Sequence, residues 1–220
     1  MAGTPPPPAP PDAVRGPRTV DRVVQFSDGV FTVALTLLVV DLAVPDLAPG
    51  FSEADLRRAL EAQFPNVEAF LLTFWVVAAY WLTHHRHFVL IHRYDGRLLL
   101  LNLVFLMTIV FIPWPTAVLG HYGSYVTSWV VYASAMAAIG LAATALWWYG
   151  SGDHGLADGV TSELRRYYAV RALIQPAMFL LSIPVAAVSL IVAQFCWIPM
   201  FVALVVVNRL YGRHATEAQG

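Results

Sequence analysis

Six stretches of mostly apolar residues, each about as long as a membrane is thick, constrain this fold more than any other feature. A helix needs roughly 20 apolar residues to cross the hydrocarbon core of a bilayer, and its backbone groups must be satisfied internally there. The sequence therefore predicts an all-α membrane protein with six transmembrane helices per subunit. The stretches cover residues 23–44, 67–88, 98–119, 126–149, 169–192 and 194–211. Only residues 194–197 are available as a turn between the last two, so a five-span alternative with the C-terminus outside stays open.

The composition excludes several classes of protein. Hydrophobic residues make up 58% of the chain and charged residues 12%, whereas a soluble domain carries about a quarter charged residues. The net charge of −1 argues against a nucleic-acid partner. The single cysteine, Cys196, cannot form an internal disulfide. We expect the lipid bilayer as the surroundings, no enzymatic activity and no cofactor.

The distribution of arginine predicts the orientation in the membrane. With the N-terminus inside, 11 of the 13 basic residues, all of them arginine, fall in cytoplasmic segments. The outer segments keep only Arg57 and Arg58. The pattern predicts a multi-pass protein of the cell membrane with both termini in the cytoplasm. The cytoplasmic arginines are Arg15, Arg18, Arg22, Arg86, Arg93, Arg97, Arg165, Arg166, Arg171, Arg209 and Arg213.

The two ends of the chain are expected to lie outside the helical domain. Residues 5–11 are proline except for Ala9, and proline lacks a backbone donor and fixes φ. We interpret residues 1–20 as a disordered cytoplasmic tail rather than a signal peptide, because no apolar core follows Met1 directly. The transmembrane domain is predicted over 21–212, with a short tail at 213–220.

A short amphipathic helix is predicted between the first two spans. Residues 52–63 carry Ser52 as the N-cap, with Glu53 and Asp55 in the first turn. This helix is expected to lie outside the bilayer.

The first span contains an ionisable residue at a depth where charge is costly. Asp28 lies about 9 Å along the helix from Arg22, too far for a pair at i, i+4. Such a residue marks a functional or structural centre that needs a partner. The candidate partners on the second and third spans are Trp81, His84, His85 and Asn102.

The same span has an aliphatic stripe on its other side. At 100° per residue, one narrow stripe contains Val33, Leu37, Val40 and Val44, and Thr36 flanks it. Ser27 and Asp28 point away from this stripe. If the stripe faces a central axis, the Ser-Asp pair faces back into its own subunit. No internal repeat is present, which favours symmetry through oligomerisation.

These residues carry a resemblance to a known family. The first span reads Arg22-x-x-x-Phe26-Ser27-Asp28, and the second holds Tyr80-Trp81-x-x-His84-His85-x-x-Phe88. Together with Asn102, these motifs resemble those of the transmembrane protein 175 potassium channels. The resemblance covers the first three spans, whereas the last three match only in hydrophobicity.

The resemblance implies a potassium-selective channel assembled as a homotetramer, with one six-helix unit per chain, K⁺ as the permeant ion and the first helix lining the pore. It implies an aliphatic constriction at Val33, Leu37 and Val40, with Thr36 as the polar pore-lining position. Valine at 33 departs from the usual isoleucine or leucine and would widen that ring. The resemblance also implies a structural motif that holds the pore helix, formed by Arg22, Phe26, Ser27, Asp28, Trp81, His84, His85 and Asn102.

The sequence also bears on other classes of membrane protein. The chain has no Thr-Val-Gly-Tyr-Gly loop, which excludes a carbonyl-ring filter of that kind. A proton-coupled transporter or a proton-permeable channel would use Asp28 with His84 or His85 as a relay. A metal site at the cluster His84, His85, His87 and His92 is disfavoured by nearby arginines, and we predict none. A purely structural membrane protein would leave Asp28 unexplained.

Overall fold

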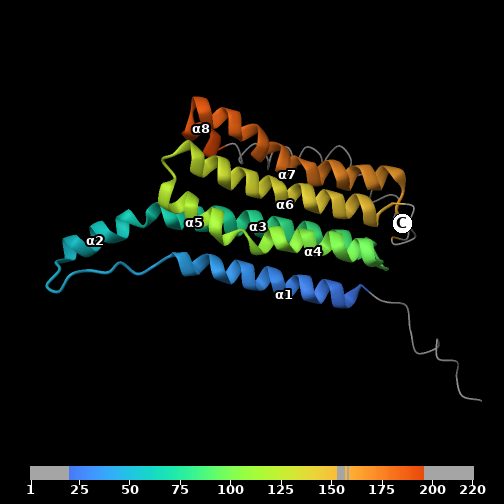
Figure 1. Ribbon diagram of the computed structural model, residues 1–220, viewed down its shortest axis with the longest axis horizontal. Coiled ribbons are helices and arrows are strands. Elements are labelled where there is room, and N and C mark those ends of the chain that lie inside the picture. The colour runs from blue at the N-terminus through green and yellow to red at the C-terminus, as the bar shows by residue number, and fades with distance from the viewer. Residues whose placement is uncertain (1–19, 153–156, 158, 196–220) are drawn as a thin grey trace, which may run out of the picture.

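The protein is described here from a computed structural model that covers residues 20–152, 157 and 159–195. Within these residues the chain is helical, apart from turns and one isolated bridge between Ile91 and Ala157. Successive long helices run in alternating directions (Figure 1). The elements are α1 (Asp21–Leu37), the 3₁₀ helix η2 (Leu38–Asp41), α2 (Glu53–Ala62), α3 (Phe64–Leu90), α4 (Gly96–Val110), α5 (Pro113–Tyr122), α6 (Val126–Gly150), α7 (Ser162–Val188) and α8 (Leu190–Gln194).

Five of the predicted spans correspond to helical segments long and apolar enough to cross a membrane. They are Asp21–Asp41, Glu53–Leu90, Gly96–Tyr122, Val126–Gly150 and Ser162–Val188. The predicted sixth span, 194–211, falls almost entirely outside the described residues, as do the tails 1–19 and 213–220. The described part of the chain therefore has the all-helical, multi-pass architecture that the sequence predicts.

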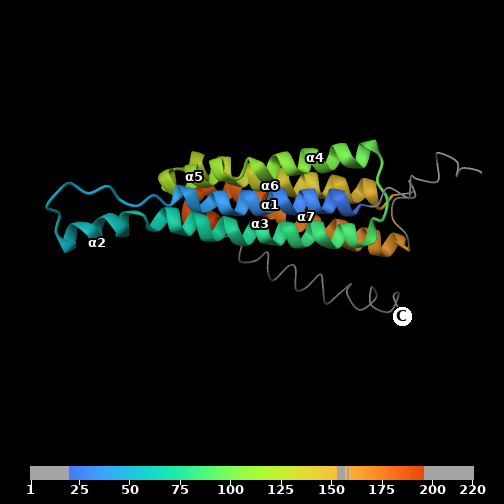
Figure 2. The same cartoon turned by 90° about the horizontal axis from the view of Figure 1, so that it is seen from below.

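The helices form successive layers, and α1 lies at one surface of the bundle. Figure 1 shows α1 on one side, then α3 with α4 and α5, then α6, and α7 on the far side. From below, α1 lies between α3 and α4 (Figure 2), and it packs against both. The opposite side of α1 consequently faces away from its own protomer.

The first span ends earlier than the sequence suggests. Its α-helix stops at Leu37, tightens into the 3₁₀ helix η2, and gives way to non-helical backbone after Asp41. The predicted span to residue 44 is wrong in this respect, and Val44 is not part of the helical stripe. A helical wheel assumes one uniform helix and cannot show where the helix ends.

Proline and glycine shape the later spans. The third span divides into α4 and α5 because Pro113 has no N–H to donate to the carbonyl of Ile109, four residues earlier. Pro176 lies inside α7 and packs against Gly140 of α6, where an added Cβ would lie only 2.5 Å from the proline Cδ. Only glycine permits this approach of α6 and α7.

The fifth span also differs from the prediction, which placed it at 169–192. It begins at Ser162, since the Thr161 side chain caps the helix by accepting a hydrogen bond from the Leu164 amide at 3.2 Å. It ends at Val188, because the extended backbone of Ser189 separates α7 from α8.

The short helix between the first two spans is confirmed. Ser52 caps α2, and Asp55 completes a capping box by accepting from the Ser52 amide at 2.9 Å. No residue of α2 is buried. The helix and the loop before it extend past the end of the bundle (Figure 1).

Most arginines of the described chain gather at one end of the bundle. At this end, here called the arginine-rich end, α1, α4 and α7 begin and α3 and α6 finish (Figure 1). Arg57 and Arg58 lie on α2 at the opposite end. This clustering is compatible with the orientation predicted from the sequence, in which the arginine-rich end is cytoplasmic. The orientation itself stays a prediction.

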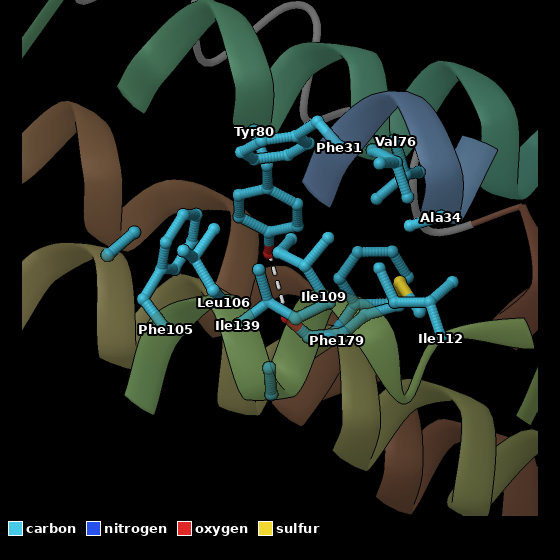
Figure 3. Packing of buried hydrophobic residues seen from close by; sticks show 14 of the residues in the cluster. Phe31, Ala34, Val76, Tyr80, Phe105, Leu106, Ile109, Ile112, Ile139 and Phe179 are labelled. Carbon is cyan, nitrogen blue, oxygen red and sulfur yellow. Dashed lines mark hydrogen bonds between the residues drawn. The ribbon is translucent and has the colours of Figure 1, made fainter. Parts of the chain in front are cut away.

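The core joins all the layers. Figure 3 shows side chains from α1, α3, α4, α6 and α7 converging on one another, and the Tyr80 hydroxyl donates to the carbonyl of Met136 at 2.8 Å. Phe31 and Ala34 supply the contribution of α1 and are almost fully buried. The inner face of α1 is therefore part of the protomer core.

Candidate functional site: the first helix and its support

The two faces of α1 differ sharply in burial. Its inner face carries Val23, Ser27, Phe31 and Ala34, all buried and spaced three or four residues apart. Ser27 is a polar residue with 0% exposure, so its hydroxyl needs partners inside the protomer.

A chain of hydrogen bonds across three helices supplies those partners. His84 Nε2 of α3 lies 3.0 Å from Asn102 Oδ1 of α4, and Asn102 Nδ2 donates to Ser27 Oγ at 3.0 Å. Ser27 Oγ in turn donates to the carbonyl of Val23 at 2.8 Å. The direction of the chain requires the neutral ring of His84 to carry its hydrogen on Nε2. Because Asn102 and His84 are also buried, the chain links α1 to α3 and α4 without competition from solvent.

Asp28 is held separately from this chain. Trp81 Nε1 donates to Asp28 Oδ1 at 2.8 Å, and the ring of His85 stacks on Trp81 with 5.9 Å between centroids. Among the described residues, Asp28 forms no ion pair with Arg22, which is exposed at the start of α1. The carboxylate is therefore anchored to α3 through tryptophan rather than through either histidine.

An aromatic cluster surrounds the buried chain, and the sequence interpretation missed part of it. His84 stacks on Phe105 at 5.3 Å and contacts Phe88 at 4.6 Å, and Phe31 lies 5.8 Å from Phe105 between ring centroids. Phe31 follows Ser27 by four residues, so the period of the inner face could have identified it. No sequence signal identified Phe105, because its contacts with Phe31 and His84 depend on how α4 packs against α1 and α3.

The outward face of α1 contains the predicted pore-lining positions. Val33 and Val40 are 57% and 71% exposed, and Thr36 and Leu37 are exposed with them. The Thr36 and Thr32 hydroxyls donate to carbonyls of their own helix, at 2.9 and 2.8 Å. We use "outward face of α1" for Gly29, Thr32, Val33, Thr36 and Leu37 together with Val40 of the continuing helix η2, all exposed in the protomer.

Phe26 does not belong to the buried support. It is 57% exposed and lies on the side of α1 that carries the outward face. The expectation that Phe26 holds the helix together with Ser27 and Asp28 has no contact within the described protomer to support it, because helical geometry turns adjacent residues by 100° and places Phe26 on the exposed side. The side-chain contacts to α4 and α3 are made by Ser27 and Asp28.

The histidines of α3 and the turn after it divide into two pairs. His84 and His87 are buried, whereas His85 and His92 are exposed. In the described chain they form no group of three or more potential metal ligands. His87 packs against Trp147 at 4.7 Å and Tyr168 at 6.1 Å between ring centroids, and neither ring nitrogen has a hydrogen-bond partner in the part described.

The two buried histidines should respond oppositely to replacement by phenylalanine. His84→Phe leaves the Asn102 oxygen unpaired, which costs about 1–3 kcal/mol for a buried group. His87→Phe removes two ring nitrogens that have no hydrogen-bond partner among the described residues. The melting temperature of this variant is therefore expected to equal or exceed that of the parent. Thermal unfolding of the purified protein in detergent measures both changes. An equal loss in the two variants would show that His87 has a polar partner in the assembled protein.

The fold and this support together define an all-α, multi-pass membrane protein whose first helix is embedded on one face and uncovered on the other. The family described as "Endosomal/lysosomal potassium channel TMEM175" matches residues 22–113, which include α1, the hydrogen-bonded chain and its aromatic cluster. Over these residues, which are less than half of the chain, the protein is similar to the TMEM175 family.

Individual relatives cover different parts of the chain. A protein from Streptomyces collinus, named a potassium channel, is 42% identical over 134 residues, which are 58% of this chain and 63% of that protein. Human TMEM175, named an endosomal/lysosomal proton channel, is 29% identical over 104 residues, 47% of this chain and 20% of that protein. The crystal structure of a TMEM175 homologue from Chamaesiphon minutus, described as potassium-selective, matches 86% of this chain and 98% of its own at a TM-score of 0.73 and 27% identity.

Proposed function

We propose that this protein is a potassium-selective channel in which α1 helices from four identical chains surround a central pore. Passive K⁺ flux would pass the outward face of α1, with Val33, Leu37 and Val40 forming an aliphatic constriction beside Thr36. The proposed location is the cell membrane, with both termini in the cytoplasm. The bacterial relatives named potassium channels support the choice of ion.

One observation carries the proposal: the first helix is fixed to its protomer on one face, while the other face presents exposed hydroxyls within a segment long and apolar enough to cross a membrane. Thr32 and Thr36 alternate with Val33, Leu37 and Val40, and an added Cβ at Gly29 would meet nothing within 4 Å. Polar groups in a spanning helix commonly face a bundle interior or a water-filled path rather than lipid. Further copies of the chain provide such an interior.

The chemistry of this face suits conduction without a carbonyl filter. Rings of aliphatic side chains form a narrow passage that admits water only when wide enough, which provides a gate by dewetting. The Thr36 hydroxyl donates to the carbonyl of Val33, so its oxygen lone pairs remain available as acceptors for a passing cation. We infer that selectivity arises where this oxygen meets the constriction.

Flux measurements in liposomes test the ion and the mechanism. Vesicles loaded with K⁺ and containing the purified protein are expected to release K⁺ down its gradient when the pH is equal on both sides, with much slower release of Na⁺ from matched vesicles. Empty vesicles provide the baseline. A requirement for a proton gradient, or equal Na⁺ release, would contradict the proposal. The mass of the detergent-solubilised protein, measured by light scattering, tests the tetramer.

Proton conduction is the second candidate, favoured by the name of the human relative and by the buried histidine. A relay from Asp28 to His84 or His85 is not supported, because Asp28 accepts from Trp81 and the chain from His84 ends at the Val23 carbonyl. Acidification of vesicles that contain a pH-sensitive dye would reveal proton entry. Proton entry that persists in Asp28→Asn and His84→Phe would place the proton path elsewhere, along the outward face.

A further inference from the structure

A shallow groove outside the proposed pore runs along α6 at the arginine-rich end. It has a volume of about 530 Å³ and lies between α4 and α7. Its lining combines aliphatic side chains with aromatic and cationic ones: Leu101, Leu141, Thr144, Ala145, Trp148, Tyr149 and Arg165. Nothing in the support or the outward face of α1 uses these residues.

The groove changes character along its length. Leu141 lies about 12 Å from Tyr149 along α6, at 1.5 Å per residue, so the aliphatic part is the deeper one in a membrane. Trp148 and Tyr149, at the end of α6, match the aromatic residues that mark a membrane interface. The groove therefore has an apolar floor beneath a polar, interfacial mouth.

The mouth carries an excess of positive charge. The guanidinium of Arg165 lies 4.2 Å from the centre of the Trp148 ring, and its Nη2 donates to the Trp148 carbonyl at 2.9 Å. Its Nε is buried without a hydrogen-bond partner among the described residues. Arg97, exposed in the first turn of α4, lies two residues after Asp95, whose carboxylate accepts from the Tyr149 hydroxyl.

The nearby acidic groups leave this excess in place. Asp95 accepts from Tyr149 at 2.6 Å and caps α4 by accepting from the Leu98 amide at 2.7 Å. Glu163 lies two residues before Arg165, about 200° around α7 and so on the other side of that helix. Among the described residues, Arg165 and Arg97 therefore lie near this end of the groove with one aspartate, Asp95, whose carboxylate is already engaged by Tyr149 and the Leu98 amide.

We propose that this groove binds an anionic phospholipid, with the headgroup phosphate at Arg165 and Arg97 and an acyl chain along Leu101, Ala145 and Leu141. Arginine forms bidentate, charge-assisted hydrogen bonds with phosphate, and basic pockets between helices at the cytoplasmic side of a membrane suit acidic headgroups. The N-terminus of α7, one turn from Arg165, adds a partial positive charge. The site is independent of which ion the protein conducts.

Native mass spectrometry of the full-length protein in detergent tests the proposal, with dioleoylphosphatidylglycerol as the probe and dioleoylphosphatidylcholine as its zwitterionic counterpart. The parent protein is expected to retain the anionic lipid at least five-fold more than the zwitterionic one. Arg165→Gln should abolish that preference. Ala145→Phe should reduce retention of the anionic lipid several-fold by filling the groove while the arginines remain.

Arg166→Gln is the matched control, because Arg166 is the exposed neighbour of Arg165 and is not part of the groove lining. Its retention should equal that of the parent. Melting temperatures without lipid identify any variant that fails to fold. If Arg165→Gln fails to fold, Ala145→Phe provides the test. Equal retention of the two lipids, unchanged retention in Ala145→Phe, or full competition by inorganic phosphate would overturn the proposal.

Discussion

Asn102→Leu is expected to detach α1 from α4 and to eliminate ion flux by the assembled protein. Asn102 is fully buried and bonds at once to His84 and Ser27, on two other helices. Leucine of similar size removes the acceptor of the His84 ring and the donor to the Ser27 oxygen, which keeps only its bond to the Val23 carbonyl, at about 1–3 kcal/mol for a buried group left without a partner. The predicted result is a large drop in the yield of assembled oligomer, measured by size-exclusion chromatography, with liposome flux near the empty-vesicle baseline.

Thr108→Val provides the control for this change on the same helix. Thr108 is partly buried, and its hydroxyl donates to the carbonyl of Phe105 within α4 at 2.6 Å. Removing that hydroxyl breaks no link between helices, so assembly and flux should stay close to those of the parent. Normal assembly and flux in Asn102→Leu would show that the buried chain is dispensable and that apolar packing alone holds α1.

Leu37→Ala is expected to raise K⁺ conductance several-fold. In the proposed assembly each chain contributes one Leu37 side chain to the constriction, so the truncation widens the ring once per subunit and favours its wetting. Leu37 is 46% exposed in the protomer, so its removal should disturb folding less than the loss of a buried leucine. Single-channel recording in planar bilayers measures the change, together with the ratio of K⁺ to Na⁺ permeability, which should fall.

Leu103→Ala is the comparison for Leu37→Ala. Leu103 of α4 is 45% exposed, almost the same as Leu37, but it lies on a different helix and outside the outward face of α1. Its truncation should leave conductance unchanged. If Leu37→Ala conducts like the parent or less, Leu37 does not lie at the constriction, and the outward face of α1 faces lipid or another part of the complex.

Local sequence signals were sufficient for much of the fold. The apolar lengths located five helical spans of the described chain, and Ser52 with Asp55 marked the start of α2. The direction of the Ser27 side chain also followed from sequence, because residues on opposite sides of a helix are related by a fixed rotation. These properties depend on residues close together in the chain.

Other properties of the site depended on packing between helices. The sequence named Trp81, His84, His85 and Asn102 as candidate partners for Asp28, but only the structure shows that Trp81 binds it while Asn102 and His84 hold Ser27. It also places Phe26 on the exposed side, and His87 in an aromatic site where its ring nitrogens have no hydrogen-bond partner among the described residues.

The sequence by itself determined that this chain forms spanning helices and that α1 has a polar position on the side opposite its aliphatic stripe. Helix length and periodicity are set by local geometry, so a single segment contains that information. The tertiary structure alone decided which buried groups pair and where the helix of the first span ends. Hydrogen-bond partners 18 to 75 residues apart are brought together by the relative rotation and depth of α1, α3 and α4, and no segment encodes these alone.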